Sequence, residues 1–463
     1  MVSFDCAELL SAVDGKLLWG NPDSVFSGIT TDSRKVAKDN LFIPLIGEKF
    51  DGHDYIEHCF EAGASICLTQ KEIPERKNCS AVMVKDTAKA LRDIAAWHRN
   101  KFDIPVVGIT GSVGKTSTKD MVACVLSKKY DVLKTQGNFN NEIGLPLTLL
   151  NLEPGHEAAV IEMGMSGFGE ISRLTAVAQP KVAVITNIGV SHIEKLGSQQ
   201  GILKAKLEIL EGLKPDGLVV LNGDDPLLRE QKGKLDFRTV FYGMDKATDY
   251  CAESYDSLGE EGTSFSVTIN NSLYKVKVPV PGVHNVYNAL AAIAVGIEMK
   301  IPVETIIDGI AEYSPGNMRQ NIISHKGMKI INDAYNASPQ SMQAAINVLE
   351  ELSAKSRGIA VLGDMLEMGA MSGELHYSVG EFIKEKKISY LITVGKESKN
   401  ISEAVADSEN NSIKLYHFDN NPDALNFLQN TVKQGDYILI KGSRGMKMEQ
   451  IAEGLLQLQY VPE

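Results

Sequence analysis

The sequence predicts an α/β protein of three domains, and three observations lead to this fold class. The chain has 463 residues, and at roughly 100–200 residues per domain this length allows two to four domains. Short β-branched runs alternate with helical patterns along the chain, as in units of strand, helix and parallel strand. Hydrophobic residues make up 43% of the chain, which is enough apolar material for several cores.

The N-terminal domain is expected at residues 1–103, as a small α/β unit. Short apolar runs alternate there with two helical patterns. The expected strands are Leu41–Pro44, Ser65–Leu68 and Ala81–Val84, and the expected helices are Tyr55–Ala62 and Thr87–Asn100.

The central domain is expected at residues 104–314. It opens with the β-branched run Ile104–Thr110, which glycine interrupts, as in a buried parallel strand that leads into a loop. A strand-rich stretch follows at residues 239–280. Further expected elements are the strands Ala158–Glu162, Val182–Thr186 and Leu218–Leu221 and the helices Thr118–Leu126, Gln199–Glu211 and His284–Met299. Strands with helices between them predict a parallel sheet.

The C-terminal domain is expected at residues 315–463, after the turn signal Ser314-Pro315-Gly316. Its expected strands are Lys329–Asn332, Ile359–Leu362, Tyr390–Val394, Ile413–Phe418 and Tyr437–Lys441, with helices between them. This alternation is typical of a Rossmann-like sheet, although the chain contains no GxGxxG motif.

Charge and cysteine usage exclude several classes of protein. The formal net charge is -12, which argues against a nucleic-acid partner. The six cysteines form no CxxC pair, so they favour a reducing compartment over a disulfide framework or a zinc cluster. The first residues show no secretion-signal pattern, and no apolar run is long enough to span a bilayer. We therefore expect a cytoplasmic protein without membrane insertion.

The strongest functional signal is the segment Thr110-Gly111-Ser112-Val113-Gly114-Lys115-Thr116-Ser117. Its glycines let the backbone curl so that N–H groups face phosphate oxygens. Lys115 would then reach the β- and γ-phosphates, and Thr116 would offer its hydroxyl to Mg²⁺. The full GxxxxGK[ST] pattern fails at Ile109, so the segment fits the shorter TGxxGK[ST] form. The alternative is a chance glycine-rich turn. The motif predicts a P-loop mononucleotide-binding sheet without choosing between GTPases, motors, kinases and ligases.

Three further side chains of the central domain are candidates for the chemistry. Glu162 closes a strand, where it is either a Mg²⁺ ligand or a surface charge. His192 follows the strand Val182–Thr186 and is either a ligand or a structural histidine. Lys206 falls inside the apolar arc of its helix, so it needs a partner or a changed charge state, unless its stem extends to solvent.

These segments resemble the Mur ligase family, and the resemblance covers almost the whole chain. It is carried by the phosphate loop, by Glu162, by Thr186-Asn187-Ile188 leading to His192, and by the segment that ends at Lys206. The motifs HNVYNALAA at 284–292 and GNMR at 316–319 follow in family order. The resemblance implies an ATP-dependent ligase that forms a C–N bond and releases ADP.

The resemblance also implies roles for individual residues. The family lysine that matches Lys206 is carbamylated, which makes it an anion that helps to hold a second Mg²⁺ together with His192. The implied catalytic residues are Lys115, Glu162, His192, Lys206 and Arg319. The implied ATP contacts are Gly111, Ser112, Val113, Gly114, Lys115, Thr116, Ser117, Asn285, Asn288, Arg319 and Asp333. The implied ligands of two Mg²⁺ ions are Thr116, Glu162, His192 and the Lys206 carbamate.

Within the family, residues 137–146, 332–342, 362–369 and 441–447 look like the member that adds D-alanyl-D-alanine. The DNPR motif of the diaminopimelate-adding member is absent. The D-glutamate-adding member has a lysine where this chain has Ala334-Tyr335, so we expect Tyr335 and Asn336 to position substrate. The implied substrate contacts in these stretches are Asn140, Asn141, Tyr335, Asn336, Ser338, Asp364, Lys441, Ser443 and Arg444.

Two N-terminal stretches, Thr31–Arg34 and Gly47–His53, are similar to the UDP-binding domain of the tripeptide ligases. By themselves, their residues fit either a diphosphate-binding turn or a solvated loop. The implied contacts to the UDP substrate are Ser33, Arg34, Asp51, Gly52 and His53.

The resemblance implies one overall reaction. UDP-N-acetylmuramoyl-tripeptide, D-alanyl-D-alanine and ATP would react through an acyl phosphate to give the pentapeptide used in peptidoglycan synthesis, with the C-terminal domain binding the dipeptide and closing on ATP. We expect a monomer. The alternatives are a family ligase for another amino acid, a P-loop switch or motor, and an inactive nucleotide-binding scaffold. The chain lacks the guanine-specific NKxD motif, which argues against the switch.

Overall fold

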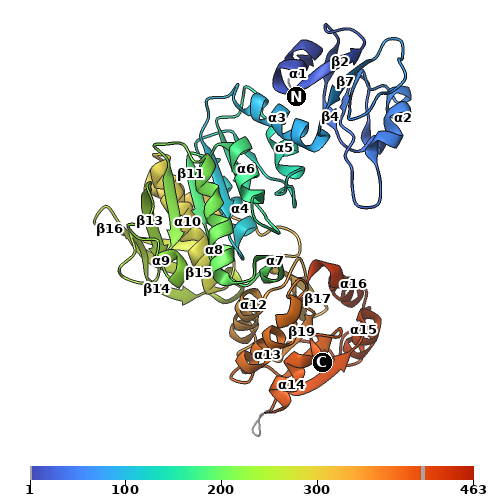
Figure 1. Ribbon diagram of the computed structural model, residues 1–463. Coiled ribbons are helices and arrows are strands. Elements are labelled where there is room, and N and C mark those ends of the chain that lie inside the picture. Colours follow the sequence, from blue (N-terminus) through green and yellow to red (C-terminus); the bar gives the residue numbers. More distant parts are fainter. Residues whose placement is uncertain (1–2, 408–411, 463) are drawn as a thin grey trace. The chain divides into compact units, whose positions relative to one another are not determined.

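The computed structural model describes residues 3–407 and 412–462, and the chain divides into two compact units. Unit 1 consists of residues 1–109, 130–183 and 207–217, and unit 2 of residues 110–129, 184–206 and 218–463. Three elements contribute residues to both units: the strands β8 (Val106–Thr110) and β11 (Val182–Ile185) and the helix α8 (Gln199–Leu207). Strands β8 and β11 lead into the segments with Lys115 and His192, and α8 itself contains Lys206. The ribbon can be followed through these elements in Figure 1.

The N-terminal part of unit 1 contains a five-stranded sheet in the order β2-β7-β6-β5-β4. Its strands are β2 (Gly15–Trp19), β4 (Ile29–Thr30), β5 (Leu41–Phe42), β6 (Ile66–Thr69) and β7 (Ser80–Val84). Strands β4 to β7 are parallel to one another, and β2 is antiparallel to β7. The remaining elements are β1 (Ser3–Asp5), α1 (Cys6–Ala12), β3 (Val25–Ser27), η1 (Ser33–Lys35), η2 (Gly52–Tyr55), α2 (Ile56–Glu61) and α3 (Thr87–Arg99). This confirms the expected small α/β unit.

The rest of unit 1 is organised around three parallel strands. Strand β10 (Ala158–Glu162) lies between β8 and β9 (Val132–Lys134). Every residue of β8 and β10 is buried, which explains why both sequences are continuous apolar runs without alternation. The register pairs Glu162 with Ile109, so this carboxylate stands beside the end of β8. The other elements are α5 (Gly144–Leu149), α6 (Glu170–Ala178) and η3 (Glu208–Gly212).

Unit 2 begins with α4 (Lys115–Leu126) and continues through α7 (Ile193–Leu196) to a second run of strands. Strands β12 (Leu218–Asn222), β13 (Arg238–Gly243) and β14 (Tyr250–Ser257) are parallel, and β15 (Thr263–Ile269) and β16 (Ser272–Val278) continue as antiparallel neighbours. The strand-rich stretch predicted at residues 239–280 is therefore confirmed. The other elements are α9 (Pro226–Arg229), η4 (Gly259–Glu261), α10 (Val283–Glu298) and α11 (Val303–Ala311).

The C-terminal part of unit 2 is a six-stranded sheet in the order β17-β18-β22-β19-β20-β21, in which only the edge strand β17 is antiparallel to its neighbour. The strands are β17 (Asn321–His325), β18 (Met328–Asp333), β19 (Gly358–Gly363), β20 (Tyr390–Val394), β21 (Lys414–Phe418) and β22 (Tyr437–Lys441). The helices are α12 (Pro339–Leu352), η5 (Gly369–Met371), α13 (Ser372–Ile383), α14 (Lys399–Ala406), α15 (Asn421–Gln429), η6 (Arg444–Met446) and α16 (Glu449–Leu456).

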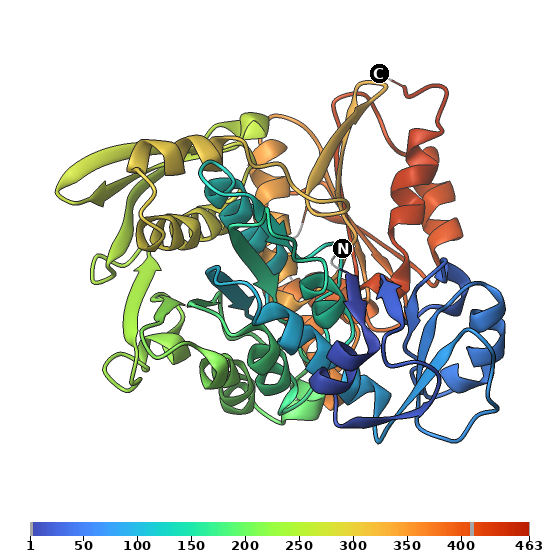
Figure 2. The same cartoon turned by 90° about the horizontal axis from the view of Figure 1, so that it is seen from above.

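Helices cover both faces of this C-terminal sheet. Alternate strand residues such as Ala360 and Leu362 pack into one apolar cluster with α12, α13 and α14. Their neighbours Ile359 and Val361 pack into a second cluster with α15 and α16. This period of two is the pattern of a strand that is buried on both faces. Figure 2 shows α15 and α16, in red, together on one side of the sheet. The predicted Rossmann-like architecture is therefore confirmed.

The structure corrects three details of the sequence prediction. Helix α4 begins at Lys115 instead of Thr118, because Gly114 takes a left-handed φ of 85° and ends the turn there. The predicted helix Gln199–Glu211 is α-helical only to Leu207 and then tightens into the 3₁₀ turn η3. In that turn the Glu208 carboxylate accepts hydrogen bonds from the backbone N–H groups of Gly169 and Ser172. The strands β1 to β4, β9 and β17 were missed.

The ion pair between Asp436 and Arg357 in the C-terminal sheet predicts an effect on the free energy of unfolding. Asp436, 1% exposed, accepts a 2.7 Å hydrogen bond from Arg357 Nε. Asp436→Ala should lower the free energy of unfolding by about 2–3 kcal/mol, less than for a fully buried pair because the Arg357 guanidinium stays within reach of water. Urea unfolding followed by circular dichroism measures this change. The exposed Glu453 on α16 provides the control Glu453→Ala, and equal stability of the two variants would contradict the prediction.

Candidate active site

The turn between β8 and α4 has the geometry of a phosphate-binding loop. Gly111 has φ 149° and Gly114 has φ 85°, conformations that L side chains rarely adopt. A Cβ on Gly111 would lie 1.8 Å from Thr186 Oγ1. Glycine is therefore required there both by backbone conformation and by lack of space. The turn ends at the N-terminus of a twelve-residue helix, where backbone N–H groups and the helix dipole favour an anion.

The segment that follows β11 holds this loop in place. Thr186 Oγ1 donates a 2.6 Å hydrogen bond to Val113 O, and the Asn187 amide both donates to Val113 O and accepts from Val113 N–H. Ser112 N–H donates to Asn187 O, and Ser112 Oγ accepts from Gly189 N–H. Five hydrogen bonds thus fix a loop of a few residues. Thr186 and Asn187 belong to a motif that carries the family resemblance, but no role was predicted for them.

Lys115 and two asparagines complete the surroundings of the loop. Lys115 Nζ donates to Gly111 O at 2.8 Å, which folds the ammonium back over the turn. On α10, Asn288 Oδ1 accepts from Thr118 Oγ1, and Asn288 Nδ2 donates to Asn285 Oδ1. The first residues of α10 are therefore tied to α4. Asn288, one of the two predicted ATP contacts on α10, thus lies against the helix that follows the phosphate loop.

Lys206 is the most unusual ionisable group of the site. Its side chain is 2% exposed, as the helical pattern predicted, and the alternative of a stem that extends to solvent is excluded. Burial, and secondarily the charge of Lys115, holds the pKa of the Lys206 ammonium well below its ordinary value. A neutral amine is a nucleophile, which a protonated one is not.

Glu162 is buried at the end of β10, with 2% exposure, which excludes the alternative of a surface charge. Its Oε1 accepts a 2.8 Å hydrogen bond from Asn140 Nδ2, and Asn140 O accepts from Gly164 N–H. Asn141 has a different environment, because its Oδ1 accepts from the N–H groups of Ile143 and Gly144 at the start of α5. Of the two predicted substrate contacts, Asn140 contacts the buried carboxylate and Asn141 shapes the turn before α5.

His192 lies at the start of α7 with a left-handed φ of 61°. Its Nδ1 is 2.8 Å from Glu367 Oε2, which belongs to the segment after β19. Gly189, on the same stretch as His192, also contacts two other segments. A Cβ there would lie 3.1 Å from Ser112 Cβ and 3.2 Å from Gln340 Oε1. Gln340 belongs to the first turn of α12, so the loop after β11 brings the start of α12 close to the phosphate loop.

The strand ends of the C-terminal sheet bring together several of the predicted residues. The register aligns Asp333 with Lys441 across β18 and β22. Lys441 Nζ donates to Asp333 Oδ2 at 2.6 Å and to Asn336 O at 3.0 Å. The Arg319 guanidinium lies 3.9 Å from the centre of the Tyr335 ring, a cation–π contact. Asp333, Tyr335, Asn336 and Lys441 lie at the carboxyl ends of the parallel strands β18 and β22, where ligands bind in open α/β sheets. Arg319 precedes β17, whose first residue pairs with Asn332 near the end of β18.

The other predicted residues of this part form a hydrogen-bonded cluster after β19 and β22. Asp364 accepts from Ser398 N–H at 2.7 Å and, through its carbonyl, from Ser443 N–H. Ser443 Oγ accepts from Leu366 N–H. Ser338 caps α12, where its Oγ accepts from Ser341 N–H. Arg444 is half exposed and pairs with Glu449 at 2.8 Å.

The N-terminal candidates are held by local pairs. Arg34 pairs with Asp32 at 2.8 Å and remains 86% exposed, next to Ser33 at the start of η1. Asp51 accepts from the backbone and ring nitrogens of His53 and from Lys71, and these bonds hold the pKa of its carboxyl below the ordinary value. Because His53 Nε2 accepts from Gln70 N–H, its Nδ1 carries the proton that faces Asp51.

Gly52 lies between Asp51 and His53, in tight contact with the backbone of Leu45. The stretch 51–53 is thus a defined turn with satisfied partners, whereas the Arg34 head is open to solvent. Of the N-terminal candidates, Arg34 has the geometry of a group that can still reach a ligand.

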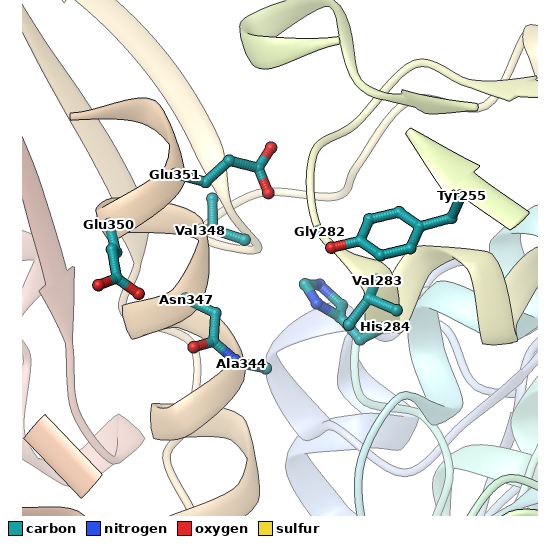
Figure 3. A pocket seen from close by; sticks show the side chains of 9 residues that line it. All are labelled: Tyr255, Gly282, Val283, His284, Ala344, Asn347, Val348, Glu350 and Glu351. Atoms are coloured by element: carbon teal, nitrogen blue, oxygen red, sulfur yellow. The ribbon is translucent and has the colours of Figure 1, made fainter. Parts of the chain in front are cut away.

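A pocket of about 350 Å³ lies between the start of α10 and α12 (Figure 3). Its polar lining residues are Tyr255, His284, Asn347, Glu350 and Glu351. Burial lowers the pKa of His284, so the ring is neutral, and its Nε2 donates to Gln320 Oε1 at 2.9 Å. Its Nδ1 is a buried acceptor without a hydrogen-bond partner among the described residues.

Two kinds of feature are absent from residues 3–407 and 412–462. No group of three or more His, Cys, Asp and Glu side chains there has the arrangement of a metal site. No helix in the described part of the chain is long and apolar enough to cross a membrane.

The loop, the buried lysine and the strand-end residues define a nucleotide-binding enzyme of the P-loop class. Comparisons with known proteins narrow the class. The family models for the Mur ligase catalytic, middle and glutamate ligase domains match residues 25–99, 109–296 and 318–444. The chain belongs to the Mur ligase family and is an ATP-dependent ligase.

Individual relatives cover nearly the whole chain. The UDP-N-acetylmuramoyl-tripeptide–D-alanyl-D-alanine ligase of Bacillus subtilis is 43% identical over 438 residues, 94% of each protein. The ligase of the same name from Escherichia coli is 34% identical and covers 98% of this chain and 99% of its own length. A crystal structure of MurF from Acinetobacter baumannii has a TM-score of 0.91 at 29% identity, covering 99% of this chain and 100% of its own.

The MurF ligase from Thermotoga maritima in complex with ADP has a TM-score of 0.83 at 30% identity, covering 93% of this chain and 97% of its own. This relative was crystallised with the nucleotide product of an ATP-dependent ligase. Together with the family assignment, it supports ATP binding by this chain.

The fit of Gly111 against Thr186 predicts an effect on nucleotide binding. Gly111→Ala should weaken ADP binding roughly tenfold to hundredfold, because a side chain forces the loop out of its conformation at a cost of about 1–3 kcal/mol. Isothermal titration calorimetry with ADP measures the effect. Gly155→Ala is the control, since a Cβ there meets only Asp131 Oδ2 at 3.8 Å. Unchanged affinity in Gly111→Ala would show that the loop does not hold the nucleotide.

Proposed function

We propose that this enzyme joins D-alanyl-D-alanine to UDP-N-acetylmuramoyl-tripeptide with ATP and produces the UDP-linked pentapeptide for peptidoglycan synthesis. The observation that carries the proposal is the 43% identity to the Bacillus subtilis ligase over 94% of both proteins. A second observation concerns residues 332–342 and 362–369, whose sequences resemble the dipeptide-adding member. These residues begin at the ends of β18 and β19, where the candidates of the C-terminal sheet cluster.

The proposed reaction has two steps. The terminal carboxylate of the tripeptide attacks the γ-phosphate of ATP, which gives an acyl phosphate and ADP. The amine of the dipeptide then attacks the acyl carbon, and phosphate leaves as the amide forms. Two anions meet in the first step, so Lys115 and Arg319 would reduce their repulsion. Removing one such cationic group commonly lowers the rate on the order of 10²–10³-fold.

Magnesium and a carbamylated Lys206 belong to the same proposal. A neutral amine attacks carbon dioxide to form a carbamate, and the depressed pKa of Lys206 favours that form. Thr116, Glu162, His192 and the carbamate would hold two Mg²⁺ ions. Mg²⁺ is usually held by one or two protein carboxylates together with substrate phosphates and water. When bound, the ions would neutralise charge that develops on the phosphates.

The remaining candidates are assigned to the three substrates. The adenine would lie at the start of α10 near Asn285 and Asn288, where the acceptor Nδ1 of His284 suits an amino group. Asp333 would contact the ribose. The UDP substrate would meet Ser33, Arg34, Asp51, Gly52 and His53, and the peptide ends would meet Asn140, Asn141, Tyr335, Asn336, Ser338, Asp364, Lys441, Ser443 and Arg444.

The proposal also includes the domain boundaries, the closure of the C-terminal domain, the cellular compartment and the oligomeric state. The domain boundaries 1–103, 104–314 and 315–463 are supported by the three family matches, because each match lies within one of these ranges. Substrates bound by three domains would allow the C-terminal domain to close on ATP and exclude water from the acyl phosphate. The enzyme would act as a cytoplasmic monomer.

Substrate choice tests the proposed reaction. ADP release should require the UDP-tripeptide and D-alanyl-D-alanine together, because the acyl phosphate forms only on a bound carboxylate and turns over only with the amine. A coupled ADP assay with single D- or L-amino acids in place of the dipeptide is the control. Rapid ATP hydrolysis without the peptide substrates would indicate a P-loop switch, and a preference for a single amino acid would indicate another Mur-type ligase.

Lys206 tests the carbamate. Lys206→Ala should lower the ligation rate on the order of 10²–10³-fold, and short carboxylic acids at high concentration should restore part of it by replacing the missing anion. Lys204 lies two residues away on the exposed face of α8, so Lys204→Ala should keep its rate. If Lys206→Ala were fully active, the carbamate would have no role.

A further inference from the structure

The segment after β19 contacts α7 at two points. Glu367 Oε2 lies 2.8 Å from His192 Nδ1. Two residues on, a Cβ on Gly369 would lie 2.9 Å from the side chain of Glu194, so only glycine lets the segment approach α7 this closely. Neither contact was foreseen from the sequence, because more than 170 positions separate the partners along the chain.

Both residues of the His192–Glu367 contact have left-handed backbone conformations. His192 has φ 61° and Glu367 has φ 64°. Histidine adopts this region more often than most residues, whereas glutamate rarely does and keeps it where the surrounding structure holds it there. The backbone of Glu367 is thus held in an uncommon conformation at the point where its side chain meets His192.

Buried groups anchor the segment on the side of Glu367 that leads back to β19. Met365 N–H donates a 2.8 Å hydrogen bond to Nε2 of the buried His376, whose Nδ1 donates to Ser372 O. Leu366 N–H donates to Ser443 Oγ at 2.9 Å. The position of Glu367 is therefore set by the C-terminal core rather than by its own side chain.

The contact between His192 and Glu367 contributes little to stability. The Glu367 side chain is 67% exposed and the His192 side chain 30% exposed, and exposed pairs contribute little to folding. A carboxylate on Nδ1 has another effect, because it keeps the ring proton on that nitrogen and leaves the lone pair on Nε2. Histidines that bind metals commonly have such a carboxylate partner.

We propose that Glu367 is a positioning residue that orients the His192 imidazole and fixes it as the Nδ1–H tautomer, so that Nε2 can bind a divalent cation. This rests on the proposed role of His192 as a metal ligand. Glu367 lies three residues after Asp364, and the backbone next to it is held by Ser443. The residues proposed to contact the peptide substrates and the ligand proposed for the metal are thereby joined through one short segment.

The tautomer of His192 tests the orientation directly. In protein with ¹⁵N-labelled histidine, the His192 signals are identified by their loss in His192→Gln. The wild type should show a protonated Nδ1 and an unprotonated Nε2, and Glu367→Ala should show a mixture of the two tautomers. The exposed Glu385, just beyond α13, provides the control Glu385→Ala, which should match the wild type. A wild-type ring protonated on Nε2, or an unchanged tautomer in Glu367→Ala, would overturn the proposal.

Metal affinity provides a second readout that needs no turnover. Binding of Mn²⁺ in the presence of ADP, followed by electron paramagnetic resonance, should weaken roughly 10–100-fold in Glu367→Ala and less in Glu367→Gln, with no change in Glu385→Ala. Equal Mn²⁺ affinity in all variants would overturn the proposed role of Glu367 without contradicting the proposed ligase reaction. Failure of the wild type to ligate the dipeptide would instead contradict the proposed function and leave the tautomer result valid.

Discussion

The close approach of the β8–α4 turn to the start of the β11 loop is the constraint on which the site depends. Gly111 has no space for a side chain against Thr186, and Asn187 binds both the N–H and the carbonyl of Val113. Because these contacts hold the loop before any ligand arrives, its N–H groups need little reorganisation to meet phosphate oxygens. The stretch that contains Thr186 and Asn187 ends at His192. The contacts that hold the phosphate loop therefore also help to fix the backbone from which the His192 side chain extends.

Lys206 shows how a fold can change the chemistry of a side chain. A charged ammonium is costly to bury, and this lysine is almost completely enclosed, with the charge of Lys115 acting on it. The neutral form is therefore favoured, and carbamylation would convert it into an anion whose attraction to Lys115 and to cations repays the burial. In its unmodified form, Lys206 lowers the stability of the fold. Its value to the enzyme would then come from the function that the modification provides.

Local patterns predicted much of the fold and of the site. The phosphate loop and the inward direction of Lys206 follow from short spacings and helical period, and the strands β10, β20 and β22 have the expected bounds. The earlier start of α4 depends on a left-handed Gly114, which spacing does not reveal. The pair of His192 and Glu367, and the contact of Gly189 with Gln340, join distant parts of the chain. Such contacts depend on tertiary packing and have no local signal.

In the proposed reaction, the phosphate loop directs the γ-phosphate of ATP onto a carboxylate. Isotope transfer tests it most directly, with the terminal carboxylate of the UDP-tripeptide labelled with ¹⁸O and the released phosphate examined by mass spectrometry. If an acyl phosphate forms, one labelled oxygen moves from the carboxylate to inorganic phosphate for each amide bond made. Unlabelled phosphate, with both labelled oxygens retained in peptide or water, would contradict the account.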